Sequence, residues 1–354
     1  MTKEVGTNVW RCAFAHRVDA SARGVAALMT SSSKTRGDDE NMVRARERFL
    51  RRALYDDLSA TIGKMMVRGA GEASERASGE DDDDDEDEDE DEDDVTEDDL
   101  ERKEAKENEV ERDERAHARD SLKTTSPRQR KLAAKRERRK CQRATTPAIR
   151  PIRKRSFRAL DLGCGDGHHA QFLSACARES GLAFELVCVD ASRAACERCA
   201  KTNPEAFVAQ VDAMATLPFY DGSIDAIMSV FAPRVPRELA RVLRGNGRVV
   251  IASAEPEHMG ELRENGELGA RVVAIEEGKK ERVEEQMQRA GFELVDREII
   301  RGVMRLDGDA MADLIAMGPS GYHNDAEAIE RVRSAPPRDV TKAFSVSVFQ
   351  KIRR

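Results

Sequence analysis

The chain has 354 residues, 36% of them charged, with a formal net charge of −8 and seven cysteines. No apolar run approaches the roughly 20 residues that cross a bilayer, residues 1–30 lack the apolar core of a secretory signal, and the cysteines are too few for a disulfide framework. These features predict a soluble intracellular protein, in the cytoplasm or in an organelle such as the plastid.

The negative charge is concentrated in one place. Fifteen consecutive acids run from Glu80 to Asp94, and removing these fifteen charges from a net charge of −8 leaves a net charge of +7. A basic remainder suits a polyanionic partner such as RNA, which the acidic run would repel or whose binding surface it would shield. Aromatic residues make up only 4% of the chain, so base-stacking surfaces are expected to be few.

Residues 1–36 are weakly patterned. Cys12 and His16 have the spacing of half a zinc site, but two ligands do not hold a structural zinc and no C-x-x-C precedes them. Taken by themselves, they are a lone cysteine and a lone histidine.

Residues 37–68 are predicted to form one amphipathic helix that docks on the domain formed by residues 156–354. Asp38 or Asp39 can cap it, and apolar residues recur at helical spacing. Arginines crowd its remaining surface, which is either a solvated basic face or an RNA contact. They are Arg44, Arg46, Arg48, Arg51 and Arg52.

Residues 69–155 are of low complexity. The acidic run lies in this segment, and residues 128–143 contain nine basic side chains. There is little apolar material to bury, so disorder or an isolated charged helix is expected. The basic part would dock on RNA or neutralise the acidic run within the chain.

Residues 156–354 alternate strand and helix patterns, which predicts an α/β fold with a doubly wound, mostly parallel sheet. The last two strand patterns alternate apolar and polar residues and are expected to form an antiparallel pair. The predicted strands are residues 158–163, 184–190, 206–211, 224–231, 247–252, 293–306 and 343–352. The predicted helices are residues 168–180, a segment ending at 202, 236–243 and 278–290.

A glycine-rich turn and three acids mark the expected ligand site. The turn reads Asp161-x-Gly163-x-Gly165-x-Gly167, unlike the G-x-G-x-x-G of dinucleotide-binding proteins, and it resembles the first motif of S-adenosylmethionine-dependent methyltransferases. Asp190 and Asp212 end the next two strands, and ligands bind at the carboxyl ends of strands in such sheets. Asp190 is placed to bind a ribose diol, and Asp212 with Ala213 to meet an adenine edge. Each acid alone is often a turn former, but together they indicate S-adenosylmethionine.

Downstream runs resemble the large-subunit rRNA (guanine-N1)-methyltransferases in order and spacing. The runs are Leu217-Pro-Phe219, Ser223–Ile227, Phe231-Ala-Pro233 and Glu238–Leu243. The resemblance also covers the segment from Gly37 to Tyr55, and Cys12 and His16 match the second half of the family's N-terminal zinc module. It spans roughly residues 10–60 and 158–354 and implies a seven-stranded methyltransferase sheet behind a small helical N-terminal region.

The resemblance implies methyl transfer from S-adenosylmethionine to N1 of a guanine in large-subunit rRNA. Phe231, Ala232 and Pro233 would form the loop beside the target base. The cofactor would be bound by Tyr55, Asp161, Gly163, Gly165, Asp166, Asp190, Asp212, Ala213 and His258. Without the resemblance, Tyr55 would be a core aromatic of a helix and His258 a surface histidine.

The chain also departs from the family. The first zinc cysteine pair is missing, so Cys12 and His16 are either relics or the surviving half of a truncated module, and bound zinc is doubtful. Tyr322 is the only aromatic left in the family's C-terminal aromatic segment. The target base, in a loop or flipped out of a helix, is expected to stack near Phe231 or Tyr322. Phosphates would be bound by Arg44, Arg48, Arg51, Arg153 and Arg155.

Two other functions remain open at this stage. The same fold serves methyltransferases of small molecules and proteins, and a non-catalytic ribosome-assembly or RNA-binding factor could carry the acidic run. The sequence leaves the oligomeric state open, a homodimer included.

Overall fold

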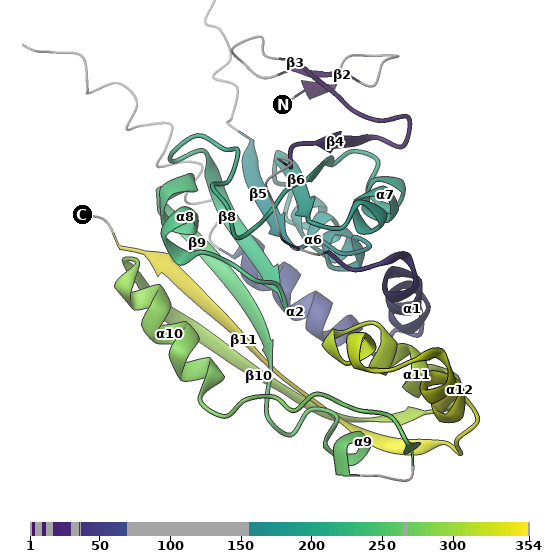
Figure 1. The fold of residues 1–354 in the computed structure, drawn as a ribbon. Helices are drawn as coiled ribbons and strands as arrows, with labels where there is room; N and C mark the ends of the chain where they lie inside the picture. Colours follow the sequence, from purple (N-terminus) through teal and green to yellow (C-terminus); the bar gives the residue numbers. More distant parts are fainter. Residues whose placement is uncertain are drawn as a thin grey trace, which may run out of the picture. The chain divides into compact units, whose positions relative to one another are not determined.

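An eight-stranded sheet forms the centre of the fold in the computed structural model, which describes residues 2–3, 9–11, 17–29, 35, 37–68, 156–264 and 268–352 (Figure 1). These residues belong to one unit, residues 1–79 with 154–354. The strand order is β10 (Phe292–Leu306), β11 (Arg338–Lys351), β9 (Leu243–Ala254), β8 (Ile224–Val230), β5 (Phe157–Leu162), β6 (Phe184–Asp190), β7 (Phe207–Gln210) and β4 (Val25–Ala27).

The strand directions confirm the predicted doubly wound, mostly parallel sheet. Strands β4, β7, β6, β5, β8 and β9 run parallel to their neighbours, and β11 lies antiparallel between β9 and β10. The carboxyl ends of β5, β6, β7 and β8 therefore meet along one edge, which is where the acids and glycines of the predicted site belong.

The sheet has one strand more than the seven expected. β4 comes from the weakly patterned residues 1–36 and pairs with β7, where Val25 and Ala26 are buried. Three residues are too few to show an alternating pattern, which is why the sequence did not reveal this strand.

A second, three-stranded antiparallel sheet contains β1 (Thr2–Lys3), β2 (Val9–Arg11) and β3 (Arg17–Asp19). Cys12 and His16 lie between β2 and β3, outside the described residues. Among the residues that are described, no group of three or more His, Cys, Asp or Glu side chains could hold a metal ion.

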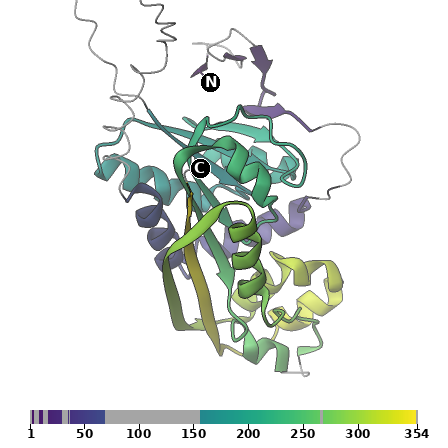
Figure 2. The ribbon, with the colours of Figure 1, turned by 90° about the vertical axis from the view of Figure 1, so that its left-hand side faces the viewer.

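Helices cover both faces of the large sheet. On one face lie α2 (Asp56–Val67), α6 (His168–Glu179) and α7 (Arg193–Thr202), and on the other lie α8 (Pro236–Val242) and α10 (Lys279–Arg289). Figure 2 shows α10 in front of β10 and β11. The remaining helical segments are α1 (Glu40–Leu50), α9 (Gly260–Glu264), α11 (Gly308–Ala316), η2 (Pro319–His323) and α12 (Ala326–Arg333).

The single helix predicted over residues 37–68 is in fact two helices, α1 and α2. Asp39 caps α1 by accepting hydrogen bonds from the backbone N–H groups of Asn41 and Met42. The chain then turns at residues 51–55, where Ala53 has a left-handed φ of 59°. Apolar residues continue at helical spacing through this turn, so periodicity alone hid the break.

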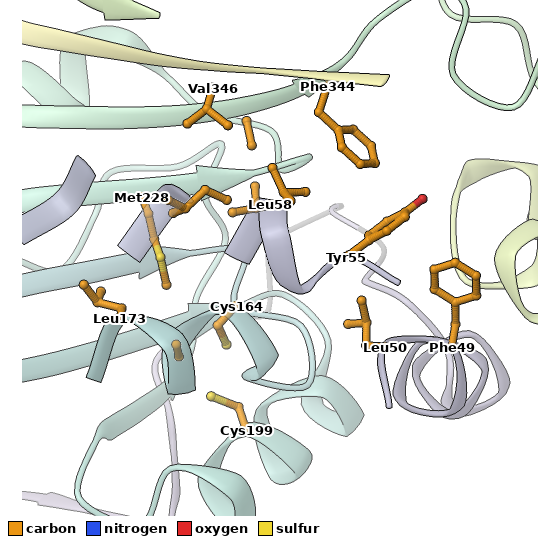
Figure 3. Packing of buried hydrophobic residues seen from close by; sticks show 14 of the residues in the cluster. Phe49, Leu50, Tyr55, Leu58, Cys164, Leu173, Cys199, Met228, Phe344 and Val346 are labelled. Atoms are coloured by element: carbon orange, nitrogen blue, oxygen red, sulfur yellow. The ribbon is translucent and has the colours of Figure 1, made fainter. Parts of the chain in front are cut away.

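Alternating strand residues divide the interior into two apolar clusters. In β6, Leu186 and Cys188 face the cluster that contains α2 and α6, whereas Val187 and Val189 face the opposite cluster. Figure 3 shows part of the first cluster, in which residues of α1 and α2 pack together with residues of β8 and β11. The helices α1 and α2 are therefore part of the apolar interior that covers one face of the large sheet.

Candidate cofactor and acceptor site

The glycine turn between β5 and α6 is packed so closely that side chains cannot replace its glycines. Gly163, Gly165 and Gly167 have φ values of 83°, 55° and 83°, in the left-handed region that favours glycine. A Cβ on Gly163 would lie 2.3 Å from the Cβ of Ala232, and one on Gly165 would lie 3.2 Å from Nη1 of Arg46. The turn thus contacts two segments that are distant in sequence, the loop after β8 and helix α1.

Asp190, the last residue of β6, is hydrogen-bonded to this turn. Its carboxylate accepts hydrogen bonds from the backbone N–H of Gly165 (3.0 Å) and of Ser192 (2.8 Å). Burial raises its pKa, and the two N–H groups oppose that rise. Each oxygen takes one of these bonds and keeps a further lone pair, as a ribose diol requires.

Asp161 lies below the turn with a carboxyl oxygen that has no partner. The residue is 1% exposed, and its Oδ2 makes no hydrogen bond within the described part of the chain. Burial raises its pKa, as do nearby Asp190 and Asp166. Buried polar atoms are nearly always satisfied in native proteins, so this orphaned oxygen fits a ligand that brings a hydrogen-bond donor.

Asp166 lies at the start of α6. One of its oxygens accepts a hydrogen bond from the backbone N–H of His168 at 3.4 Å. Burial raises its pKa, and the positive charge of Arg46 opposes the rise. Two further acids, Asp161 and Asp190, lie close enough to influence one another's charge, so the glycine turn is surrounded by carboxylates.

A strap from the N-terminal segment, which we define as Thr35 with residues 37–39, lies across the ends of β6 and β7. Thr35 donates a hydrogen bond to Oδ2 of Asp212 at 2.7 Å, and Ser192 donates one to the backbone oxygen of Asp38 at 2.6 Å. A Cβ on Gly37 would lie only 2.4 Å from the backbone nitrogen of Ser192. The strap therefore covers the place predicted for the ribose and adenine.

Tyr55 and His258 form a buried pair beside the turn. The Tyr55 oxygen lies 3.1 Å from Nε2 of His258, and the Tyr55 ring packs edge-on between Phe49 and Phe344 (Figure 3). The backbone N–H of Ala343 lies 3.4 Å from Nδ1 of His258; in the tautomer that accepts this bond, the ring carries its proton on Nε2 and can donate it to Tyr55. The hydroxyl proton of Tyr55 then remains available for another acceptor.

Burial fixes the protonation states of this pair. It raises the pKa of Tyr55 far above its ordinary value and lowers the pKa of His258 to about 4. Both side chains are therefore neutral near pH 7. His258 is 6% exposed, so it is not the surface histidine that its sequence context alone would suggest.

Phe231, Ala232 and Pro233 form a rigid loop after β8. Phe231 has a left-handed φ of 53° although it is not glycine, and such strained residues gather at functional sites. Its side chain is 49% exposed, and its ring centre lies 5.4 Å from that of Phe344. Arg234 donates a hydrogen bond to the backbone oxygen of Ala232 at 2.9 Å, and burial lowers the pKa of Arg234 to about 10.

The structure thus gathers most of the predicted site residues along one edge of the sheet. Tyr322 lies 46% exposed and contacts the strap, its hydroxyl 3.4 Å from Oδ1 of Asp38. The arginines suggested as phosphate contacts on α1 and directly after it pair with acids: Arg44 with Glu40, Arg48 with Asp313 and Arg51 with Glu47. Arg153 and Arg155 lie outside the described residues.

Sequence reasoning missed two residues of the site, Thr35 and Arg46. Nothing in their local sequence separates them from other polar residues, because each reaches the site only through the tertiary fold. The one available signal was that Arg46 lies in a segment resembling the methyltransferase family, as Tyr55 does.

Comparisons with known proteins agree with this geometry. Residues 159–251 match the family model of a methyltransferase domain. Together with the strand order and the glycine turn, this match identifies residues 159–251 as a methyltransferase domain. None of the described helices is long and apolar enough to cross a membrane.

More particularly, the chain is similar to enzymes named for one reaction on ribosomal RNA. It is 36% identical over 196 residues to the 23S rRNA (guanine(748)-N(1))-methyltransferase of Streptomyces fradiae, covering 54% of this chain and 66% of that one. It is 32% identical, over 54% of this chain and 63% of the relative, to a putative 23S rRNA (guanine-N(1)-)-methyltransferase of Micromonospora griseorubida. The match thus spans slightly less than two thirds of either relative.

A relative with a different acceptor also matches. The malonyl-[acyl-carrier protein] O-methyltransferase of Halorhodospira halophila is 29% identical over 187 residues, which are 49% of this chain and 61% of that one.

Proposed function

We propose that this protein transfers a methyl group from S-adenosylmethionine to N1 of a guanine in large-subunit rRNA. The observation that carries the proposal is the 36% identity to an enzyme named for this reaction. The geometry supports it, since an exposed aromatic residue, Phe231, is held in a strained loop directly beside the glycine turn.

The site fits S-adenosylmethionine, which when bound supplies an electrophilic methyl group on a sulfonium. The orphaned oxygen of Asp161 can accept a hydrogen bond from the ammonium of the cofactor's amino-acid end. Asp190, already fixed by two backbone N–H groups, can accept from both ribose hydroxyls. Asp212 and Ala213 follow β7 at the same edge and can meet the adenine, while Gly163 and Gly165 allow close approach.

Phe231 and its loop are suited to hold the acceptor. A guanine in an RNA helix cannot reach a buried methyl group, so the target is an unpaired or flipped base that stacks on an aromatic side chain. The exposed ring of Phe231 offers that surface, and the close packing of Ala232 on Gly163 fixes its distance from the cofactor turn. Holding the guanine and the methyl donor at a fixed distance and orientation supplies a large part of the rate enhancement of a methyl-transfer reaction.

His258 positions Tyr55 and does not take the guanine proton. In the tautomer with the proton on Nε2, Nδ1 of His258 accepts from Ala343 and Nε2 donates to Tyr55, so neither nitrogen is a free base. Its lowered pKa of about 4 also makes it a poor proton acceptor. We assign His258 the task of orienting the Tyr55 hydroxyl toward the cofactor.

A methyltransferase of a small carboxylic acid or a carrier-bound acid is a second candidate, favoured by the match to the Halorhodospira halophila enzyme. A non-catalytic RNA-binding role is disfavoured because a site without cofactor would leave the buried oxygen of Asp161 unsatisfied.

Transfer of tritium from methyl-labelled S-adenosylmethionine separates these functions. We expect label in unmodified large-subunit rRNA transcripts and none in malonyl carrier protein. Phe231→Ala is expected to lower transfer to RNA at least tenfold while binding of S-adenosylhomocysteine is unchanged, because the residue faces the acceptor only. Label in the carrier protein alone would support the second candidate, and cofactor binding without any transfer to RNA would contradict the proposal.

A further inference from the structure

Arg46 is the one arginine of α1 that points into the site. Its Nη1 and Cδ would lie 3.2 Å and 3.5 Å from a Cβ on Gly165, and no other Arg or Lys is among the atoms that such a Cβ would meet at Gly163, Gly165 or Gly167. The Arg46 side chain is 23% exposed, compared with 54% for Arg44 and 73% for Arg51. It therefore forms part of the wall of the glycine turn.

The guanidinium of Arg46 uses only one of its nitrogens for hydrogen bonds within the described residues. Nη2 donates to the carboxylate of Asp38 in the strap and to the backbone oxygen of Met317 at the end of α11 (2.7 Å). The Nε and Nη1 groups, of which Nη1 is the nitrogen nearest to Gly165, keep their donors unused. The Nε–H shares its edge of the guanidinium with Nη2, so Nη1, beside Gly165, is the nitrogen that can donate a charge-assisted hydrogen bond to a carboxylate at the turn.

The charges around Arg46 suit an amino-acid ligand. Burial opposes its charge, but Asp38, then Asp190 and Asp166, raise the pKa of Arg46 above its ordinary value. Without a ligand, several carboxylates surround a single guanidinium at this turn. An α-amino acid brings an ammonium, for which Asp161 has an unsatisfied oxygen, together with a carboxylate, for which Arg46 has unused donors.

We propose that Arg46 binds the α-carboxylate of the cofactor's methionine moiety through Nη1, the nitrogen nearest to Gly165. This inference rests on the proposed use of S-adenosylmethionine. In this arrangement the bonds from Nη2 to Asp38 and Met317 hold the guanidinium in the orientation that binds the carboxylate. Arg46 would then connect the cofactor to the strap and to the end of α11.

Calorimetric titration of the full-length protein with two matched ligands tests this assignment. S-Adenosylhomocysteine carries the carboxylate, whereas its decarboxylated analogue S-adenosyl-3-thiopropylamine keeps the amine, the ribose and the adenine. A charged hydrogen-bonded contact is worth about 10- to 100-fold in affinity, so the wild-type protein should prefer S-adenosylhomocysteine by that factor. Arg46→Gln should bind both ligands within about threefold of each other, while the control Arg44→Gln keeps the wild-type preference.

The ratio of the two affinities removes effects that are common to both ligands, such as a shift of the strap. Where the glutamine variant fails to fold, Arg46→Met keeps the apolar stem and should lose the preference in the same way. A preference that survives in either variant, or one that is absent from the wild-type protein, would overturn the role of Arg46. A wild-type protein that binds neither ligand would instead refute the proposed cofactor itself.

Discussion

At the scale of single residues, Gly163 is where the cofactor turn and the acceptor loop touch. Its missing side chain lets Ala232 pack directly on the turn, and its φ of 83° is one that other residues adopt only with strain. The contact couples the position of Phe231 to the position of the turn, so disturbing it should affect catalysis more than cofactor binding.

We therefore expect Gly163→Ala to lower the free energy of unfolding by about 1–3 kcal/mol and to reduce methyl transfer at least tenfold, with a smaller loss of S-adenosylhomocysteine affinity. Urea denaturation, calorimetry and tritium transfer measure the three quantities. Gly181→Ala is the control, since Gly181 also has a positive φ of 64° but a Cβ there would meet nothing within 4 Å. Equal effects of the two substitutions would contradict the account of Gly163.

His258 makes stability depend on pH. Burial lowers its folded-state pKa to about 4 from an ordinary value of 6.5. The unfolded chain therefore takes up a proton first as the pH falls, and the stabilisation present above about pH 6.5 is lost progressively down to about pH 4. Between pH 7 and pH 5 this histidine alone should cost about 2 kcal/mol of unfolding free energy.

The variant His258→Gln should lack that contribution, so its unfolding free energy should fall by about 2 kcal/mol less than that of the wild-type protein between pH 7 and pH 5. Denaturant titrations at the two pH values measure the difference, in which the contribution of the buried His169 cancels. Parallel pH profiles for the two proteins would show that His258 is not held neutral.

Residues at strand ends were predictable from the sequence, whereas Arg46 was not. The carboxyl ends of neighbouring parallel strands lie along one edge of the sheet. Asp161 and Asp190 were predicted to lie at that edge because each comes at the end of a strand pattern. Arg46 lies on the polar side of an amphipathic helix among other arginines. Its role depends on how α1 packs against the glycine turn, which helical periodicity does not encode.

At the scale of elements, α1 and α11 are joined by an ion pair between the half-exposed Arg48 and the buried Asp313. Nε and Nη2 of Arg48 both donate to the carboxylate of Asp313, whose side chain is 2% exposed. Helix α11 was not predicted from the sequence. Its start is marked by Asp307, which accepts a hydrogen bond from the N–H of Ala310, but its apolar residues are too continuous to show a helical period.

Without Arg48, the one remaining cation near the Asp313 carboxylate among the described residues is Arg333, at 3.9 Å. We expect Arg48→Ala to lower the free energy of unfolding by about 2–3 kcal/mol, as urea denaturation would show. Arg51→Ala is the matched control at the C-terminal end of the same helix, because Arg51 is 73% exposed and pairs with Glu47 one turn away, a contact worth about 0.5 kcal/mol at most. A loss for Arg48→Ala no larger than that of the control would refute the structural role.

At the scale of the whole molecule, segments from both ends of the sequence build one site. The strap and α1 come from the first fifty residues, the glycine turn and acids from residues 161–213, and Met317 and Phe344 from the last forty. The mostly parallel sheet and its antiparallel C-terminal pair could be predicted because each depends on local patterns. The closure of the site by the strap could not, because it depends on contacts between segments about 150 residues apart.

The charge of the whole chain is divided between one acidic run and a basic remainder. Fifteen acids between Glu80 and Asp94 account for the negative net charge of an otherwise basic chain. A basic body is what a phosphate backbone requires, and binding to RNA through it should weaken as salt is added.

A methyl group on guanine N1 blocks reverse transcription because it occupies the base-pairing edge, so the proposed methylation of large-subunit rRNA leaves a readable stop. Primer extension on large-subunit rRNA from cells lacking this gene is the most direct measurement, with 1-methylguanosine quantified in the digested RNA. We predict that one strong stop disappears and returns on complementation with the wild-type gene, but not with Asp190→Ala. An unchanged stop pattern in the rRNA of every compartment would contradict the proposed function.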